Sequence, residues 1–259
     1  MAGFDSAPRP VKTWHSKSYD HVDPKRSAFD GKGKTLLITA GATGRVERIV
    51  ILSRSPGPQQ EAKSALNSLY PSLQVLPYQV SITDHGRINS ILKDIGKIDV
   101  LVMSATATEP GFGGSNLDVS VDDMQLIFDT NVIAAFNLVQ TYLSLPEPVG
   151  RRKTIINVSS LASHIVLPGQ VGYGPSKAAV SQIFNHFAKE LDPTKATLLS
   201  YHPGALYTAK AASYDIKDNP EASFLHGRMV WSNWDAAELV ALREKVENDP
   251  NYLTIGLQQ

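Results

Sequence analysis

A serine, a tyrosine and a lysine stand at intervals in this sequence that suit proton transfer. Tyr173 follows Ser160 by 13 positions, and Lys177 follows Tyr173 by four. On a helix, residues four apart project from one face, so Tyr173 and Lys177 would lie side by side. An ammonium group favours the phenolate, so the spacing predicts a lowered pKa for Tyr173. If the Ser160 hydroxyl holds a carbonyl oxygen, the phenol could exchange a proton with a ketone or an alcohol.

Two different elements must bring these side chains together. Residues 154–158 (TIINV) have the pattern of a buried strand, so Ser160 falls just past its carboxyl end. A loop rich in Gly, Pro and Gln follows, and Tyr173 then opens a stretch with helical apolar periodicity. The sequence therefore predicts a strand, a loop and a helix, with the hydroxyl at the strand end facing the start of the helix.

The rest of the chain from residue 34 alternates short apolar runs with helical patterns, which is typical of an α/β domain with a parallel sheet. Residues 1–33 are polar and show no sustained period, so we expect an N-terminal arm there. The expected strands are 35–39, 48–53, 74–80, 98–103, 154–158, 197–201 and 229–232. The expected helices are 59–69, 84–95, 121–143, 172–190 and 235–247. No internal repeat or second domain is visible.

Composition excludes several classes of function. The 259 residues are 42% apolar, which fits one domain with a sizeable core. Twenty-five basic and 25 acidic residues cancel, so nucleic acid and anionic membranes are not expected partners. The absence of cysteine excludes disulfides and thiolate chemistry, and we expect no metal site. With no signal sequence and no apolar run of membrane-spanning length, we expect a cytoplasmic protein.

The run from Ser160 to Lys177 resembles the corresponding run of the short-chain dehydrogenase/reductases. This resemblance implies a single domain, residues 34–259, with a Rossmann-type doubly wound parallel sheet. It implies that Tyr173 exchanges the proton, Ser160 positions the substrate oxygen, and Lys177 lowers the pKa of the tyrosine and holds a ribose. Asn131, in the run Phe128-Asp-Thr-Asn-Val132, matches the family's fourth residue, which would hold a relay water.

A glycine-containing turn follows the first expected strand, in the run Ala40-Gly-Ala-Thr-Gly44. Such a turn lets backbone N–H groups approach a pyrophosphate closely. The resemblance assigns cofactor contacts to Thr39, Gly41, Gly44, Arg54, Asn131, Tyr173, Lys177, Pro203, Gly204 and Thr208.

The residue after the second expected strand bears on the choice of cofactor. Arg54 stands where a basic residue of this family pairs with the 2′-phosphate of NADP, and an acidic one would bind the ribose hydroxyls of NAD. No acidic residue occupies the neighbouring positions 52, 53 or 55. The resemblance therefore favours NADP(H) over NAD(H), with a surface arginine as the alternative.

The sequence departs from the family pattern in two connections. Only residues 40–47 separate the first two expected strands, whereas a parallel crossover needs a dozen or more residues and usually a helix. We expect the first crossover helix to be shortened and the second strand to be displaced or joined by an irregular loop. Only residues 209–218 stand where the family has its substrate lid. The stretch 219–234 then resembles fungal members from specialised metabolism, and skipped coding sequence would explain both gaps.

Other cofactor-side motifs are also altered. Ser81 replaces the family's aspartate after the third strand, and the run Met103-Ser-Ala-Thr106 keeps only Ala105 of Asn-Asn-Ala-Gly. Asp84 comes too late to replace the aspartate and has the position of a helix cap.

Three functions therefore stay open. The first is an NADP(H)-dependent oxidoreductase that interconverts a ketone and a secondary alcohol on a small organic substrate. The second is an inactive or impaired protein with the same fold, such as a pseudoenzyme or interaction protein. The third, a hydrolase using Ser160 and His164, lacks an elbow motif and an acidic partner. By resemblance, helices 121–143 and 172–190 would form a homodimer or homotetramer.

Overall fold

The chain folds around one parallel sheet of seven strands in the order β3-β2-β1-β4-β5-β6-β7. The computed structural model describes residues 9–15, 33–39, 46–110, 114–148, 150–204 and 220–255. The strands are β1 Thr35–Thr39, β2 Arg48–Ser53, β3 Gln74–Gln79, β4 Val100–Met103, β5 Lys153–Val158, β6 Ala196–His202 and β7 Met229–Trp231. This is the doubly wound α/β sheet that the sequence predicts.

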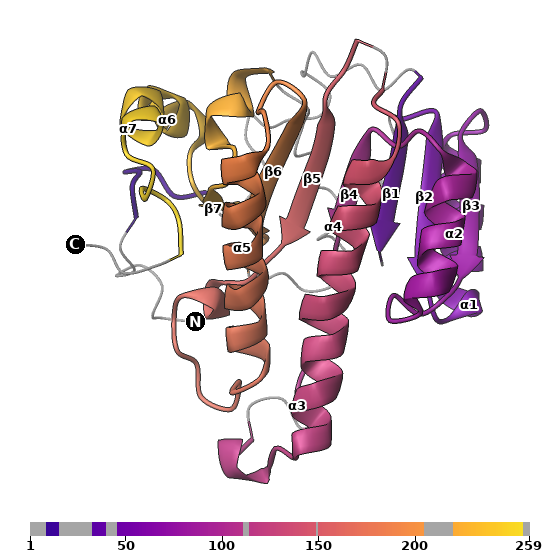
Figure 1. Cartoon of the computed structure of the whole chain (residues 1–259), viewed down its shortest axis with the longest axis horizontal. Coiled ribbons are helices and arrows are strands. Elements are labelled where there is room, and N and C mark those ends of the chain that lie inside the picture. Colours follow the sequence, from indigo (N-terminus) through magenta and orange to yellow (C-terminus); the bar gives the residue numbers. More distant parts are fainter. Residues whose placement is uncertain are drawn as a thin grey trace.

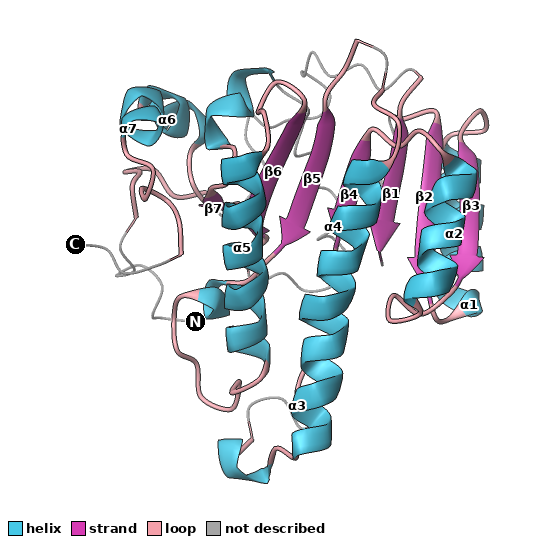
Figure 2. Cartoon of the chain, in the orientation of Figure 1, coloured by secondary structure: helices cyan, strands magenta, loops and turns pink. Residues whose placement is uncertain are grey.

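Helices cover both faces of this sheet (Figure 1). The α-helices are α1 Pro56–Leu69, α2 His85–Ile95, α3 Val121–Phe128, α4 Ala134–Ser144, α5 Tyr173–Glu190, α6 Ala236–Ala241 and α7 Arg243–Asn248. Short helical turns are η2 Asn116–Asp118, η3 Asp129–Ile133, η4 Leu161–Ser163 and η6 Pro220–Leu225. Figure 2 shows α2, α4 and α5 side by side on one face.

Alternation of apolar residues along the strands explains why both faces are covered. Leu37, Leu101, Ile155 and Leu198 are fully buried in the cluster that includes residues of α2, α4 and α5. Their neighbours in sequence point to the other face, where the residues of β5 and β6 pack with those of α6 and α7. A strand buried on both faces must be apolar throughout, which is why these strands read as continuous apolar runs.

The predicted elements match the structure closely, with two differences. The expected helix 121–143 is interrupted by η3, a π-helical turn, and the expected helix 235–247 is divided into α6 and α7 near Leu242. The predicted cap Asp84 is confirmed, because its carboxylate accepts a hydrogen bond of 3.0 Å from the backbone N–H of Arg87.

The second strand is not displaced, so that alternative of the sequence prediction is wrong. β2 lies between β1 and β3 and pairs with β1 in parallel over five residues, from Thr35 opposite Arg48 to Thr39 opposite Leu52. The connection is short nevertheless, because Thr39 ends β1 and Arg48 begins β2. Its residues 40–45 lie outside the described residues, and so do residues 209–218, where the substrate lid is expected.

Part of the N-terminal arm is docked on the domain at the β7 end of the sheet. Val11 is buried, and Trp14 forms an antiparallel bridge to Trp234. The Trp14 ring lies edge-on to Trp231, with 5.9 Å between the centroids. The backbone N–H and C=O of His15 are both bonded to Asn233. Val11 and Trp14 therefore belong to the apolar cluster that surrounds β7.

Candidate active site

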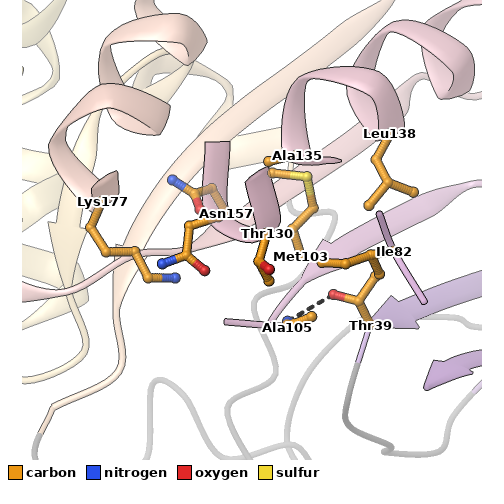
Figure 3. Close-up of a pocket in the computed structure, with 10 residues that line it drawn as sticks. Thr39, Ile82, Met103, Ala105, Thr130, Ala135, Leu138, Asn157 and Lys177 are labelled. Atoms are coloured by element: carbon orange, nitrogen blue, oxygen red, sulfur yellow. Dashed lines mark hydrogen bonds between the residues drawn. The ribbon is translucent and has the colours of Figure 1, made fainter. Parts of the chain in front are cut away.

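The candidate site lies where the strand order reverses, at the carboxyl ends of β1 and β4. In doubly wound sheets, ligands bind in the crevice at such a switch point. A small cavity opens there, and Figure 3 shows Lys177 and Asn157 projecting toward it from one side and Thr39 bonded to Ala105 on the other. Its walls include Thr39, Met103, Ala105, Asn131, Asn157 and Lys177.

Ser160 and Tyr173 come from separate elements and meet through their side chains. Ser160 lies just beyond β5 in extended backbone, and its hydroxyl accepts a hydrogen bond of 3.2 Å from the N–H of Ala162. Tyr173 is the first residue of α5. A hydrogen bond joins the side chains of Ser160 and Tyr173. The structure thus brings together the two hydroxyls that the sequence placed 13 positions apart.

Lys177 lies one helical turn beyond Tyr173, and only 5% of it is exposed. Its Nζ is 5.7 Å from the centroid of the Tyr173 ring and donates a hydrogen bond of 2.9 Å to the carbonyl of Val158. Burial lowers the pKa of Lys177 to about 8, because the charged form loses hydration. An ammonium has three N–H donors, and within the described part of the chain one of them is used.

The pKa of Tyr173 is raised in this structure, so the predicted net lowering is wrong. Burial is the main cause, the hydrogen bond with Ser160 acts in the opposite direction, and the carboxylate of Glu109 raises the pKa further. The spacing of Tyr173 and Lys177 could not reveal how strongly the phenol is desolvated. The phenol is therefore protonated near neutral pH and can donate a proton.

Asn131 links the loop after β4 to α5. It lies in the π-helical turn η3, a geometry often found at functional sites. Its Oδ1 accepts from the N–H of Ala107 at 2.7 Å and from the hydroxyl of Thr106 at 3.2 Å. Its Nδ2 donates to the carbonyl of Ala107 at 2.8 Å and to the hydroxyl of Ser176 at 2.9 Å. Since these four bonds saturate the side-chain amide, a relay water at Asn131 would have to bind a group other than this amide.

Thr39 compensates for the altered run 103–106. Its Oγ1 accepts hydrogen bonds from the N–H groups of Ser104 at 2.8 Å and Ala105 at 2.9 Å. The hydroxyl thus fixes the backbone beside the crevice even though only Ala105 of the family pattern is kept. Gly41, Gly44 and Thr208, the other predicted contacts of this kind, lie outside the described residues.

Two more predicted contacts follow β6. Pro203 and Gly204 come directly after His202, and Gly204 has φ +82°, a conformation that side chains rarely adopt. A Cβ at Gly204 would also lie only 3.3 Å from Ser232 and Asn233. The turn therefore requires glycine for both its backbone conformation and its close packing.

Arg54 lies at the same edge of the sheet, immediately after β2, and is exposed. Its carbonyl accepts a hydrogen bond of 3.3 Å from the side chain of Gln79 at the end of β3. Within the described part of the chain, no carboxylate forms an ion pair with its guanidinium.

Sequence analysis missed one residue of this site. Glu109 is 4% exposed, and its Oε1 accepts hydrogen bonds from the N–H groups of Gly172 at 2.6 Å and Tyr173 at 2.7 Å. A lone glutamate in a loop, 64 positions from Tyr173, carries no signal in a single sequence. Only the folded chain brings it to the first turn of α5.

Two other kinds of site are absent from the described residues. They contain no cluster of histidine and acidic side chains suited to a metal ion. Nor does any helix in the described ranges combine the length and apolar character needed to cross a membrane.

Comparison with known proteins decides the family. The family model for short chain dehydrogenase matches residues 31–219. The chain belongs to the short-chain dehydrogenase/reductase family. It is therefore a member of a family of oxidoreductases, and the geometry at Ser160, Tyr173 and Lys177 has the spacing expected for it.

The similar curated proteins are fungal members of this family. The chain is 41% identical to short chain dehydrogenase/reductase nsrO of Aspergillus novofumigatus, with 99% of each chain covered. It is 40% identical to short chain dehydrogenase/reductase AacuD of Aspergillus aculeatus, also with 99% of each covered. A crystal structure of a 3-oxoacyl-[acyl-carrier protein] reductase with bound NAD from Brucella melitensis superposes with TM-score 0.70 at 20% identity, covering 85% of this chain and 97% of that one.

The alignment with nsrO also bears on the expected deletions. It spans 291 positions, and this chain has 259 residues, so at least 32 aligned positions have no counterpart here. Because both chains are covered almost completely, the missing positions are internal. This short-chain dehydrogenase is thus shorter than its fungal relative at internal positions.

Proposed function

We propose that this protein is an NADP(H)-dependent oxidoreductase that interconverts a ketone and a secondary alcohol on a small organic substrate. The hydrogen bond between Ser160 and Tyr173, with the ammonium of Lys177 one helical turn away, is the observation that carries this proposal. Membership of the family supports oxidoreduction, and the fungal relatives support a role in specialised metabolism.

The residues at the switch-point crevice fit a nicotinamide nucleotide. Lys177 is a buried cation with N–H donors left over, which suits the hydroxyls of a ribose. Thr39 holds the backbone of Ser104 and Ala105 at the crevice, and the glycine conformation at Gly204 fixes the turn after β6. Arg54, exposed at the end of β2, would pair with a 2′-phosphate and so favours NADP(H).

The proton chemistry follows from the state of Tyr173. Its raised pKa keeps the phenol protonated at neutral pH, so Tyr173 would donate a proton to the oxygen of a ketone. The Ser160 hydroxyl, already bonded to Tyr173, would hold the same oxygen in place. Lys177 would stabilise negative charge that develops on the phenol after the proton leaves. Bound NADPH would supply the hydride.

The assembly and location are part of the same proposal. Leu126, Ile133 and Phe136 are between 40% and 54% exposed along α3, η3 and α4. Apolar side chains exposed on adjacent helices would be covered in a homodimer or homotetramer built on these helices and α5. A cytoplasmic location is the remaining part of the proposal, and the lack of cysteine among the 259 residues fits a reducing compartment.

An inactive protein with this fold is the second candidate. The short connection between β1 and β2 is the feature behind it, because a connection without a helix would weaken the pyrophosphate site. The active enzyme is favoured by the four polar side chains that lie together at one edge of the sheet, those of Ser160, Tyr173, Lys177 and Asn131.

Reduction assays separate the two candidates. The wild type is assayed for NADPH oxidation with a panel of cyclic, aliphatic and aromatic ketones, beside Tyr173→Phe and Ser160→Ala. We expect turnover by the wild type and its loss in Tyr173→Phe, which keeps the ring and removes the proton donor. Ser160→Ala should lose most of its activity. Wild-type protein that binds NADPH but reduces no ketone would favour the inactive alternative.

A further inference from the structure

Glu109 connects the loop after β4 to the helix that carries Tyr173. It is buried, and its Oε1 accepts two hydrogen bonds from consecutive backbone N–H groups, those of Gly172 and Tyr173. The first N–H groups of a helix have no partner within the helix, and a carboxylate satisfies them and interacts well with the helix dipole. Gly172 has no side chain that could cap α5, so a residue distant in sequence supplies the cap.

Side chains of α3 and of Glu109 pack closely against Gly172. A Cβ at Gly172 would lie 2.8 Å from Cδ1 of Ile127, 2.9 Å from Sδ of Met124 and 3.2 Å from Oε1 of Glu109, so these side chains would have to shift to accept one. The start of α5 therefore lies directly against α3 and the carboxylate.

Both backbone polar groups of Tyr173 are engaged. Its N–H donates to Glu109, and its carbonyl accepts a hydrogen bond of 2.7 Å from the hydroxyl of Ser176. Ser176 is in turn bonded to Asn131, which holds Ala107. Two sets of hydrogen bonds thus connect the loop after β4 to the backbone of Tyr173. Glu109 bonds to it directly, and Ala107 is connected to it through Asn131 and Ser176.

The second carboxylate oxygen of Glu109, Oε2, does not take part in these hydrogen bonds to the backbone of α5. Oε2 is buried, and no donor from the described residues forms a hydrogen bond with it. A buried carboxylate oxygen that accepts no hydrogen bond has a negative charge that is weakly screened. This charge therefore interacts strongly with neighbouring groups. Tyr173 is such a neighbour.

We propose that Glu109 is a positioning residue of this active site, which anchors the backbone of Tyr173 and sets a buried negative charge next to the proton donor. The charge opposes formation of the phenolate, so Glu109 keeps Tyr173 protonated to higher pH. The kinetic side of this proposal rests on the proposed function, whereas the anchoring and the ionisation of Tyr173 do not.

Other charged groups on the elements packed against α5 could act on the phenol as well. Within the described ranges these are His164 after η4, Asp129 in η3, Asp122 and Asp123 in α3, His202 in β6, and Lys177 in α5 itself. The carboxylate of Asp123 accepts a hydrogen bond from Ser120, and that of Asp129 accepts one from Gln125, so each of these two carboxylates has a partner other than Tyr173. Of the acidic groups in the described ranges, Glu109 is the one that contacts the backbone of Tyr173.

Two variants, Glu109→Gln and Glu109→Ala, separate the effect of the negative charge from the effect of the hydrogen bonds to the backbone of Gly172 and Tyr173. Glutamine keeps an oxygen that accepts both N–H bonds but removes the charge, and alanine removes both. Glu190→Gln is the matched control, since it removes one exposed negative charge at the far end of the same helix. Ionisation of Tyr173 is followed by ultraviolet difference absorbance, each protein being compared with the same protein carrying Tyr173→Phe, because the chain has nine tyrosines.

We expect the Tyr173 ionisation midpoint to move to lower pH in Glu109→Gln and to stay in place in Glu190→Gln. The thermal midpoint should fall in Glu109→Ala well below that of Glu109→Gln. In turnover assays, the pH profile of kcat/KM for reduction should move in the same direction as the ionisation. An unchanged or raised ionisation midpoint in Glu109→Gln, or equal thermal midpoints in the two variants, would overturn the proposal. If Tyr173 titrates as expected in a protein without turnover, the proposed function fails and the role of Glu109 stands.

Discussion

The Nδ1 atom of His202 accepts a hydrogen bond of 3.2 Å from the backbone N–H of Leu161. This bond joins the end of β6 to the turn that begins at Ser160. His202 is 6% exposed, and its ring lies edge-on to Trp231 at 5.0 Å. The histidine must be neutral at Nδ1 to accept the bond, so the turn beside Ser160 depends on the protonation state of a buried group.

Acid should therefore destabilise the protein through His202. Burial, and next the nearby His164, lower the pKa of His202 to about 4, against about 6.5 in the unfolded chain. Because the folded pKa is the lower one, the stabilisation is complete above about pH 6.5 and is lost as the pH falls toward about 4, at a cost of about 3 kcal/mol. Urea unfolding across this pH range should show a shallower loss in His202→Gln than in the wild type.

His226→Gln is the control for this measurement. The pKa of His226 is also lowered, chiefly by burial, so His226 contributes an acid sensitivity of the same sign without touching Leu161. If His202→Gln and the wild type lose stability equally as the pH falls, His202 is not the group that titrates.

Arg54 should determine the preference for NADPH over NADH. A charge-assisted contact with the 2′-phosphate is worth about 1.5–3 kcal/mol, which is roughly a tenfold to hundredfold difference in affinity. We expect calorimetric titration to give tighter binding of NADPH and a narrowed gap in Arg54→Ala. Arg48→Ala is the control, because Arg48 lies at the opposite end of β2 and is bonded to Gln74. Equal affinities of the wild type for the two nucleotides would show that Arg54 does not bind the phosphate.

Restoring a helix after Gly44 should strengthen cofactor binding. β1 and β2 are paired as neighbours, but only residues 40–47 connect them. A crossover helix normally covers the sheet face and presents its N-terminus to the pyrophosphate. An insertion of about a dozen residues with a Gly-x-Gly turn should raise both the thermal midpoint and the affinity for NADPH. A wild-type chain that is monodisperse, heat-stable and saturated by micromolar NADPH would instead be a working short form.

Phe136 should lie in the interface of an oligomer. It is 40% exposed and stacks on Phe187 of α5, with 5.9 Å between the ring centroids. A glutamate there would place a charge in an apolar interface, so Phe136→Glu should reduce the mass measured by analytical ultracentrifugation. Leu69→Glu, which changes a 71% exposed residue at the end of α1, should not. A monomeric wild type would contradict the proposed assembly.

The strands and helices could be predicted because their periodicity is local. β5 and α5 follow from the apolar run 154–158 and the helical pattern after Tyr173, and with them the meeting of Ser160, Tyr173 and Lys177. Glu109 could not be predicted, since its partners are 63 and 64 positions away and nothing in its own loop marks it.

The electrostatics of the site could not be predicted either. The four-residue spacing of Tyr173 and Lys177 indicated a cation beside a phenol, but burial reverses the direction of the pKa change for Tyr173. The polar Asn131 stands out within an apolar stretch of the sequence, but its four hydrogen bonds go to two distant parts of the chain, the loop after β4 and α5. Desolvation and long-range hydrogen bonds are properties of the folded chain.

Transfer of a labelled hydride tests the central claim most directly. The wild type and Tyr173→Phe would be incubated with NADPH deuterated at the transferable position of C4 and with a ketone, and the products analysed by mass spectrometry. If Tyr173 protonates the substrate oxygen while the nucleotide reduces its carbon, the wild type should yield the secondary alcohol with one deuterium on the carbinol carbon, and Tyr173→Phe should yield none. Absence of labelled alcohol from the wild type under saturating NADPH, or equal labelling by both proteins, would contradict the account.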